Sequence, residues 1–559
     1  MELLLLLAVA TFGATASAIG LARGGRAGRR GAVLGGLSLL GVVAVSFALT
    51  APRVGAGEIP PGVGILDGRL IPNDYMRLVI ALWALDGVLI VLIAWLATGL
   101  AGLRGLMPAV LASIAGGSVA LAATNLVLGT AAAGATGLVA LLILLAWRDP
   151  AGIPAAAREL RVTILATVLL MGAIVVAPLA AGVAVRGATD GSAIAAGTPG
   201  TAGAAALVGL LVLAVALGAG LRIGVIPFHL RIPQLTDAAP PIALPLLLAW
   251  VPLPLAVVSL AAVDLLVAPL ALPLGGEQLV IVAVVIVTLV GASLAAILQD
   301  DIRHTTGYLV IADGAIVLLG LAALTPDAWG PARVWLVTLA ATKTAVAAWA
   351  AVVESRFGSR QLPELRGWIR RSPILGAALL VAAVASFGFP GWVAYESRVA
   401  LARLTGGPPL DAVLMALSFL TLPAYLRLLG MGTGRPTSRV DRAAPERIVR
   451  TRRTETLPVE ADGTGAAATA ATARPARVGP DTTANAAKRA AGRSRKRAAR
   501  GATRTGRRIM RAVRRDATEL AAAAVLTLAV LAALTSWGVL DIWGASSEPA
   551  PITTNASSD

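Results

Sequence analysis

Residues 220–241 read GLRIGVIPFHLRIPQLTDAAPP and directly follow an apolar run, GAAALVGLLVLAVALGA, at 203–219. The run and the first residues after it are long enough to cross a bilayer as a helix. The stretch carries Arg222, Pro227 and one of only two histidines in the chain, His229. Proline removes a backbone donor and interrupts a helix, and ionisable residues within a membrane are costly and usually functional. The stretch therefore predicts a membrane helix that is broken near its end and carries charge there.

The composition predicts an all-α polytopic membrane protein. Of the 559 residues, 57% are hydrophobic and 14% are charged, and the mean hydropathy is +0.82. A water-soluble core of this size cannot bury that apolar fraction. The absence of cysteine excludes disulfides, thiol catalysis, iron–sulfur clusters and zinc–thiolate sites. Two histidines also argue against a multi-histidine metal site, so we expect no cofactor, no metal and no catalytic residue.

Apolar runs predict about fourteen transmembrane helices. Arginines gather in the loops after odd-numbered spans and are scarce after even-numbered ones, which places the basic loops in the cytoplasm and both termini outside. The first run lacks a basic leader and a cleavage site, so we expect a retained span in a multi-pass protein of the bacterial inner (cytoplasmic) membrane. The expected spans are 2–21, 32–50, 75–100, 107–124, 126–147, 160–185, 203–226, 242–270, 277–299, 306–325, 331–353, 373–403, 410–430 and 518–543.

Most of the net charge of +17 lies in one low-complexity segment. Residues 435–515 hold 22 Lys/Arg and 6 Asp/Glu and too few apolar residues to fold alone. We expect a loop held near anionic lipid headgroups, with docking to an acidic protein partner as the alternative. No aromatic residues interleave with the charges, so nucleic-acid binding is not expected. The expected segments are helices 1–3 in 1–106, a core of helices 4–13 in 107–430, the basic cytoplasmic loop in 431–516, and the last helix with an external tail in 517–559.

Seven ionisable residues fall within the expected spans and are candidates for function. Lys343, in LAATKTAVAAW, lies near the middle of its span and is the only lysine outside the basic segment. Asp86 is similarly central. Residues near span ends can extend to water, which we expect of Asp264 and which is the alternative to a functional role for Asp313 and Arg222. The seven are Asp86, Arg222, Asp264, Asp313, Lys343, Glu396 and Arg398.

Three prolines interrupt apolar runs: Pro227 in VIPFH, Pro252 in LLAWVPLPL and Pro390 in SFGFPGW. These predict breaks in helices 7, 8 and 12. Broken membrane helices with adjacent charges are typical of ion pathways in transporters. A plain proline kink is the alternative for each break alone.

The opening stretch, from RIGVIPFH onward, resembles the seventh-span motif of the antiporter-like membrane subunits of respiratory complex I and of Mrp-type cation/proton antiporters. LDGVLIVLIAW (85–95) resembles their third span, LQDDIRHTTGYLVIADGAIVLLGL (298–321) their ninth-to-tenth connection, and ELRGWIRRSPILGAALLVAAVASFGFPGWVAYESR (364–398) the lead into their twelfth. The resemblance implies two inverted five-helix repeats, each with a broken helix. It also implies proton movement along ionisable side chains at mid-membrane depth.

The sequence departs from that family at charged positions. The family's fifth-span glutamate falls at Ala131, and its eighth-span lysine falls near Pro252, where no charge exists. Arg222 stands for the seventh-span lysine and Arg398 for the twelfth-span lysine or glutamate. Arginine does not deprotonate in proteins, so neither can relay a proton. With Ala131 in place of the acid, we expect Arg222 to lack the acidic partner that the family supplies from its fifth span.

Lys343 matches an eleventh-span lysine of some members, and Asp313 stands where others have histidine. A buried lysine can lose its proton and pass it on. We expect a proton path through Lys343, with Asp86, Asp313 or Glu396 as acidic neighbours and His229 near the cytoplasmic entry.

The resemblance predicts an antiporter-like subunit, of the N or M type, of a proton-translocating NADH:quinone oxidoreductase. Its partners would be the other membrane subunits of a complex I-like assembly. The alternatives are a structural assembly subunit with a decayed path and an independent cation/proton antiporter.

Overall fold

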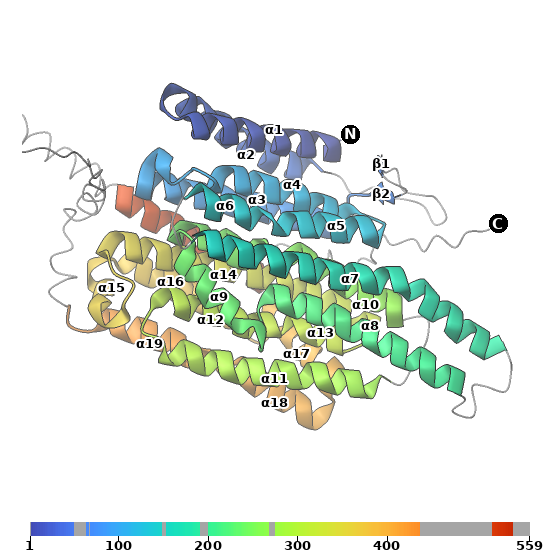
Figure 1. The fold of residues 1–559 in the computed structure, drawn as a ribbon. Coiled ribbons are helices and arrows are strands. Elements are labelled where there is room, and N and C mark those ends of the chain that lie inside the picture. The colour runs from blue at the N-terminus through green and yellow to red at the C-terminus, as the bar shows by residue number, and fades with distance from the viewer. Residues whose placement is uncertain are drawn as a thin grey trace, which may run out of the picture.

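The computed structural model describes residues 2–49, 63–65, 68–147, 152–189, 199–267, 274–436 and 517–539. These form a bundle of helices that run side by side, with α1 and α2 at one edge and α11 and α18 at the opposite edge (Figure 1). The first half contains α1 (Glu2–Arg23), α2 (Gly25–Ala48), α3 (Asp74–Thr98), η1 (Gly99–Ala101), α4 (Leu106–Ala122), α5 (Leu126–Gly137), α6 (Val139–Ala146), α7 (Gly152–Thr189), α8 (Pro199–Ile223), η2 (Phe228–Leu230), α9 (Arg231–Ala238), η3 (Pro241–Ala243), a π-helical turn η4 (Leu246–Trp250) and α10 (Leu253–Val267).

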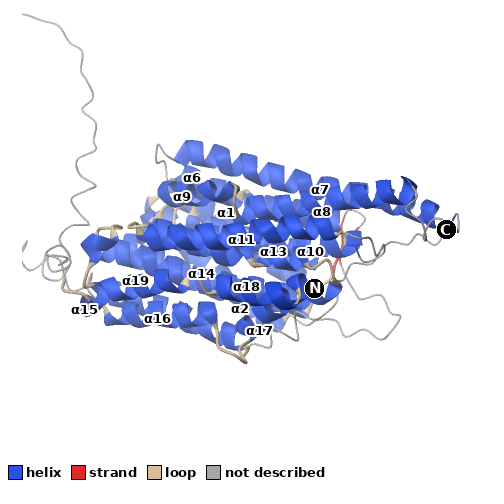
Figure 2. Cartoon of the chain, turned by 90° about the horizontal axis from the view of Figure 1, so that it is seen from below, coloured by secondary structure: helices blue, strands red, loops and turns tan. Residues whose placement is uncertain are grey.

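The second half of the bundle completes a helical fold, as Figure 2 shows by its nearly uniform colouring. Its elements are α11 (Gly275–Leu298), α12 (Ile302–Ala315), α13 (Val317–Ala322), η5 (Pro326–Ala328), α14 (Trp329–Phe357), η6 (Leu362–Leu365), α15 (Trp368–Arg371), α16 (Pro373–Phe387), α17 (Val393–Gly406), α18 (Pro408–Ser418), α19 (Leu422–Thr433) and a final helix, Ala517–Trp537.

Twelve helices or helix pairs of the described residues are long and apolar enough to cross a membrane. The two other predicted spans correspond to α4, a shorter apolar helix, and to the broken pair α16–α17. The prediction of about fourteen spans therefore agrees with the structure. Of the predicted basic loop, 431–516, only residues 431–436 are described.

Three spans form the centre of the bundle. The most apolar parts of Pro241–Leu266, Ile302–Ala322 and Pro326–Phe357 are fully buried, whereas less than half of the corresponding part of α1, α7 and the final helix is buried. A charged side chain on a central helix is shielded from lipid by the surrounding helices, which is where membrane proteins accommodate such residues. Functional charged residues are therefore expected at the centre of the bundle.

All three predicted helix breaks are confirmed. α8 ends at Ile223, and Gly224, whose φ of +85° favours glycine, turns the chain toward the cis Ile226–Pro227 bond and α9. The eighth span changes from a π-helical turn to α10 around Pro252, and the twelfth is interrupted between Phe387 and Val393. Three further interruptions within the expected spans were not predicted. They lie at Leu138 between α5 and α6, at Ile316 between α12 and α13, and between Ser418 of α18 and Leu422 of α19.

One short hairpin departs from the all-helical prediction. Strands β1 (Val63–Ile65) and β2 (Gly68–Leu70) pair antiparallel, and Leu70 forms a bridge with Ala123. The hairpin fixes the start of α3 against the turn between α4 and α5. Asn73 then caps α3 by accepting a hydrogen bond from the backbone N–H of Met76.

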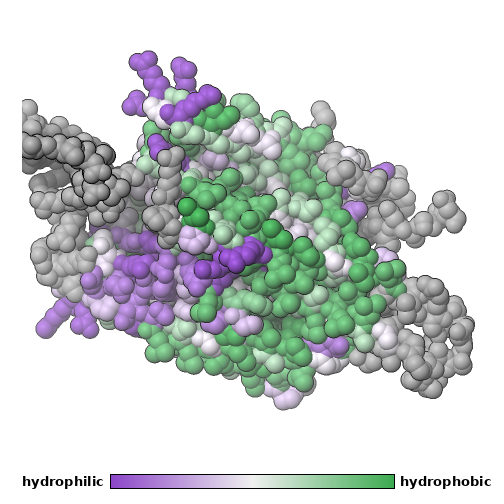
Figure 3. All heavy atoms as spheres, in the orientation of Figure 1, coloured by the Kyte–Doolittle hydropathy of each residue, from purple (hydrophilic) through white to green (hydrophobic). Residues whose placement is uncertain are grey.

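The surface divides into an apolar body and one strongly polar end, the end at which α15 lies (Figure 3). At that end Arg356 forms an ion pair with Glu519 at the start of the final helix. At the other end of the same helix Trp537 stacks on Trp392, beside the break between α16 and α17. The final helix therefore runs from the polar end toward the end at which α1 begins (Figure 1).

Candidate functional site

The first buried charge cluster joins α7, α8 and α9. Glu159 on α7 accepts hydrogen bonds from Arg231 Nε at 2.7 Å and from Arg222 Nη1 at 3.4 Å. None of the three residues is more than 5% exposed. Arg231 also donates to the backbone carbonyl of Arg222 at 2.7 Å, which ties the start of α9 to the end of α8 across the helix break. One carboxylate therefore holds two guanidiniums around the seventh-span break. We name these three residues the arginine cluster.

The arginine cluster gives Arg222 an acidic partner from a helix other than the fifth span. Ala131 is exposed on α5, and the residue of that helix beside Arg222 is Gly137, whose carbonyl accepts from Arg222 Nη2 at 3.4 Å. The carboxylate comes from Glu159, on the next long helix. Glu159 lies one residue before the expected span 160–185 and between Arg158 and Arg161 in sequence, so its charge resembled an ordinary loop charge.

The second buried charge cluster surrounds Lys343 on α14. Its ammonium group forms an ion pair with Asp313 of α12 and donates to Tyr425 Oη at 2.9 Å and to Ser386 Oγ at 3.3 Å. Lys343 and Tyr425 are 0% exposed, and Asp313 and Ser386 are at most 3% exposed. Three helices besides α14 thus supply oxygen atoms to one nitrogen. We name this group the lysine cluster.

Arg398 lies against the lysine cluster. Its guanidinium donates to the backbone carbonyl of Ser386, at the end of α16 where the twelfth span breaks. It also lies over aromatic rings, 4.5 Å from the ring centroid of Trp335 and 5.3 Å from that of Phe419. Contacts of this kind stabilise a cation when water is excluded. Arg398 therefore places a fixed positive charge beside Ser386, a direct neighbour of Lys343.

Asp86 belongs to neither cluster. It is 2% exposed and accepts a hydrogen bond of 3.1 Å from Trp250 Nε1, at the end of the π-helical turn. Trp250 in turn stacks on Trp83, with ring centroids 5.3 Å apart. The carboxylate thus fixes the broken eighth span against α3.

The remaining predicted residues lie away from the buried clusters. Glu396 is exposed and accepts a hydrogen bond from the backbone N–H of Gly391, so it binds the turn before α17 and is not part of the lysine cluster. His229 is partly buried in η2, and its Nδ1 has no hydrogen-bond partner among the described residues. Asp264 is partly exposed near the end of α10, although its Oδ1 is buried and has no hydrogen-bond partner among the described residues. Pro390 lies in the exposed turn before α17.

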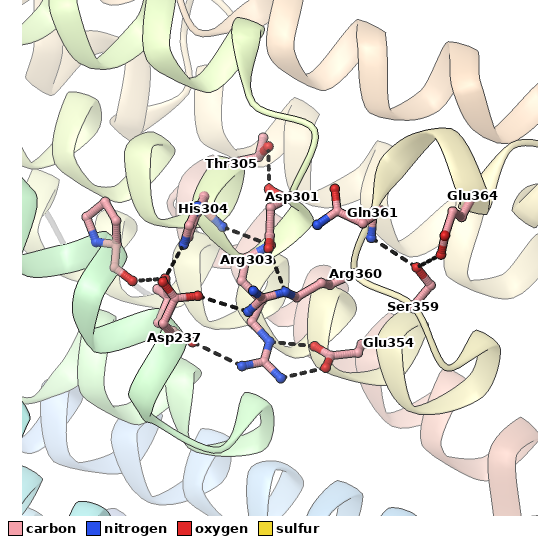
Figure 4. A network of polar contacts seen from close by, with 12 residues as sticks. Asp237, Asp301, Arg303, His304, Thr305, Glu354, Ser359, Arg360, Gln361 and Glu364 are labelled. Atoms are coloured by element: carbon pink, nitrogen blue, oxygen red, sulfur yellow. Dashed lines mark hydrogen bonds and ion pairs between the residues drawn. The ribbon is translucent and has the colours of Figure 1, made fainter. Parts of the chain in front are cut away.

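A polar network at the polar end of the bundle was missed by sequence reasoning (Figure 4). Arg360 contacts Asp237 at 2.9 Å and Asp301 at 2.8 Å, and His304 Nε2 lies 3.1 Å from Asp237. Nearby, Arg303 forms a bidentate pair with Glu354, with both contacts at 2.5 Å. The network joins the end of α9, the start of α12 and the end of α14. In the sequence these charges belong to separate loops, and their proximity becomes visible only in the folded chain.

The same network contains the described residues that come closest to a metal site. Ligand atoms of Asp237, Asp301 and His304 lie within 4.8 Å of one another. However, Arg360 already contacts both carboxylates. A guanidinium between two carboxylates supplies the positive charge that a cation would bring, so the arrangement is accounted for as an ion-pair network.

Comparison with known proteins relates this architecture to respiratory membrane complexes. A family model described as NADH:quinone oxidoreductase/Mrp antiporter, TM, matches residues 123–419. The chain is 30% identical over 158 residues to NADH-quinone oxidoreductase subunit N 2 of Syntrophobacter fumaroxidans, covering 28% of this chain and 34% of that protein. It is 29% identical over 231 residues to NADH-quinone oxidoreductase subunit N 2 of Acidobacterium capsulatum, and the match covers 39% of this chain and 47% of that protein. The chain thus spans between about a third and a half of the length of these relatives.

Solved structures share the fold over most of the chain. A chain of the Mrp complex from Dietzia sp. DQ12-45-1b matches with a TM-score of 0.64 at 20% identity, covering 98% of this chain and 96% of that one. A chain of respiratory complex I from Thermus thermophilus matches with a TM-score of 0.54 at 21% identity, covering 78% and 91%. At these identities the likeness establishes the fold. The three helix breaks lie within the residues matched by the family model.

Proposed function

Because this chain belongs to the NADH:quinone oxidoreductase/Mrp antiporter family of membrane proteins, we propose that it is an antiporter-like subunit of a proton-translocating, complex I-like NADH:quinone oxidoreductase. It takes part in proton translocation coupled to electron transport and works beside other membrane subunits. It lies in the inner membrane of a bacterium, with the polar end of the bundle in the cytoplasm and both termini outside. The asymmetric placement of arginine in the loops supports that orientation.

The observation that carries the proposal is the ion pair of Lys343 with Asp313. Both groups are buried at the centre of the bundle and hold opposite charges in hydrogen-bonding contact. An ammonium group can give up a proton and later regain it, and Asp313, Tyr425 and Ser386 are three oxygen neighbours through which the proton can arrive or leave. Arg398 stays charged, so it adds a fixed positive charge beside the lysine cluster and exchanges no proton itself.

The arginine cluster has a different part in the proposal. Glu159 is held between two guanidiniums that do not deprotonate, so it remains an anion. A cluster of this kind orders the seventh-span break and sets the local field, but its side chains pass no proton. Proton exchange by side chains is therefore assigned to the lysine cluster, and the first half of the chain supplies structure and charge.

The basic segment is proposed as a cytoplasmic loop held near anionic lipid headgroups. A segment with a net charge of +16 is attracted to the negative leaflet surface within a Debye length. The loop separates the core helices from the final helix, so its attraction to lipid would keep that helix close to the bundle. Docking to an acidic protein partner is the competing interpretation.

Purification of the tagged full-length chain from its native membrane tests the proposal. The expected result is co-purification with quinone-reducing and other membrane subunits, together with NADH-driven proton uptake by vesicles that contain the complex. Purification of the chain without such subunits, with cation-driven proton exchange that needs no NADH, would instead support an independent cation/proton antiporter. Co-purification with a complex whose proton uptake is unaffected by changes at Lys343 would support the structural subunit.

A further inference from the structure

The final helix contacts the broken twelfth span on both sides of its break. Before the break, Ser536 Oγ donates a hydrogen bond of 2.8 Å to the backbone carbonyl of Ala385, near the end of α16. After the break, Trp537 stacks on Trp392, with ring centroids 6.2 Å apart, and Gly538 lies against the side chain of the first residue of α17. Three consecutive residues at the end of the final helix therefore hold both halves of the span.

The hydroxyl group of Ser536 is used between helices and not within its own helix. Serine and threonine inside a helix commonly bond a carbonyl three or four residues earlier, and the neighbouring Thr535 does so with Leu531 at 2.8 Å. Ser536 instead bonds Ala385, 151 positions away in sequence, and is fully buried. The last carbonyls of a helix have no partner within it, and inside a membrane neighbouring helices must satisfy such groups. Ser536 therefore supplies a donor that the end of α16 requires.

The carbonyl bonded by Ser536 adjoins the part of α16 that belongs to the lysine cluster. Ser386 directly follows Ala385. Its Oγ lies 3.3 Å from Lys343 Nζ, and its own carbonyl accepts a hydrogen bond from Arg398 of α17. Two successive carbonyls at the end of α16 are thus held by side chains from two other elements, the final helix and α17. A shift of this turn would move both an oxygen neighbour of Lys343 and the fixed charge of Arg398.

The opposite end of the final helix is attached to the helix that carries Lys343. Glu519 forms an ion pair of 2.9 Å with Arg356, near the end of α14. Glu519 is partly exposed, and exposed ion pairs contribute little energy, so the buried contact at Ser536 carries more of the attachment. The final helix therefore bridges α14, which supplies the lysine, and the broken span, which supplies Ser386. It lies outside the residues matched by the family model.

We propose that the final helix clamps the broken twelfth span and that Ser536 is a positioning residue for proton exchange at Lys343. Its hydroxyl group holds the last turn of α16, so that Ser386 and Arg398 stay beside the lysine. Ser536 acts through the backbone of Ala385 and does not itself exchange a proton. The inference rests on the proposed function and deepens it, because it assigns a part in proton exchange to a helix outside the matched residues.

Loosening of the break can be measured without NADH or quinone. In this cysteine-free chain, Ser397→Cys places one thiol at a buried position of α17, which a membrane-permeant maleimide reaches only when the helix opens locally. In that background, Ser536→Ala should raise the rate of modification about fivefold, the factor in an equilibrium constant that corresponds to one hydrogen bond. The control is Thr535→Val, which removes a hydroxyl whose bond lies within the final helix and should leave the rate unchanged. Equal rates in Ser536→Ala and Thr535→Val would overturn the clamp.

A second measurement decides whether the clamp serves proton exchange. In assembled complexes, Ser536→Ala should lower proton uptake per electron pair, whereas Ser536→Thr keeps the hydroxyl and should retain the wild-type value. Ser536→Ala should cause no further loss when combined with Lys343→Ala, because the group being positioned is then absent. Unchanged uptake in Ser536→Ala, equal losses with alanine and threonine, or a further loss in the double variant would overturn the positioning role. If the wild type shows no NADH-driven uptake, the proposed function fails, and the modification rates still decide whether the final helix clamps the break.

Discussion

Replacing Glu159 with glutamine should lower the free energy of unfolding more than the equivalent change in the lysine cluster. Glu159 is 2% exposed and lies 2.7 Å from Arg231 and 3.4 Å from Arg222. Arginine does not neutralise itself by losing a proton, so the substitution leaves two buried guanidiniums without a counter-charge. Breaking one buried pair typically costs about 3–5 kcal/mol. Since both pairs share this carboxylate, we expect a loss of about 5 kcal/mol in the free energy of unfolding, the upper end of that range.

The matching substitution in the lysine cluster is expected to cost less. Asp313→Asn also removes a buried carboxylate, but Lys343 can become a neutral amine and keeps Tyr425 and Ser386 as hydrogen-bond partners. We therefore expect a loss of about 1–3 kcal/mol, the cost of an imperfectly satisfied buried group. Glu396→Gln, at an exposed carboxylate, serves as the control and should change stability by less than about 1 kcal/mol.

The order of these three losses can be measured on the purified protein in mild detergent. Denaturing detergent is added stepwise, and tryptophan fluorescence reports the unfolding. Adding Arg222→Gln to Glu159→Gln should recover part of the loss, because only Arg231 then lacks a counter-charge. The reasoning would be refuted if Glu159→Gln were as stable as the wild type, or if Asp313→Asn lost more stability than Glu159→Gln. Either result would mean that the arginine cluster does not hold fixed charges while the lysine cluster can exchange a proton.

Three further predictions follow from particular contacts and from the charge pattern. Trp250→Phe removes the hydrogen-bond donor to Asp86 and should lower the free energy of unfolding by about 1–3 kcal/mol. The control is Trp83→Phe, because the ring nitrogen of Trp83 has no hydrogen-bond partner among the described residues, and it should cost less in the same assay. Equal losses would contradict the role of the hydrogen bond. Single cysteines at Ser355 and Ser557 of this cysteine-free chain should be labelled from opposite sides of the membrane; an impermeant reagent that labels both in intact cells would reject the orientation. Deletion of about residues 490–508 should leave the final helix inserted, because lipid attraction is spread over the whole segment; loss of the assembled complex on native gels would point to a docked protein partner.

The helix breaks and the central lysine were predictable because each depends on local information. Proline within an apolar run interrupts a helix wherever it occurs, and Pro227, Pro252 and Pro390 all lie at observed breaks. The depth of Lys343 follows from its distance to the ends of its span. The structure accordingly confirms the three helix breaks, and the membrane depth of Lys343 stays a prediction.

The partners of the charges were not predictable, because they depend on packing between distant segments. Glu159 reaches Arg222 across 63 positions, and Tyr425 reaches Lys343 across 82. Arg231 belonged to the quoted stretch, but its role becomes visible only when α9 folds back onto the end of α8. Glu396 resembled a membrane carboxylate because the twelfth span was expected to run to residue 403. The break instead lets it accept a hydrogen bond from Gly391 in the turn before α17.

Proton uptake per electron pair in vesicles that contain the assembled complex tests the central claim most directly. The comparison is between the wild type, Lys343→Ala, Lys343→Arg and Thr342→Ala, a control at the neighbouring buried position. Assembly is checked on native gels. If Lys343 exchanges the proton, alanine and arginine should both lower uptake, because alanine removes the basic group and arginine keeps its charge but cannot release a proton. Thr342→Ala should behave as the wild type. Unchanged uptake in an assembled Lys343→Ala complex would contradict a proton-translocating role for the lysine cluster.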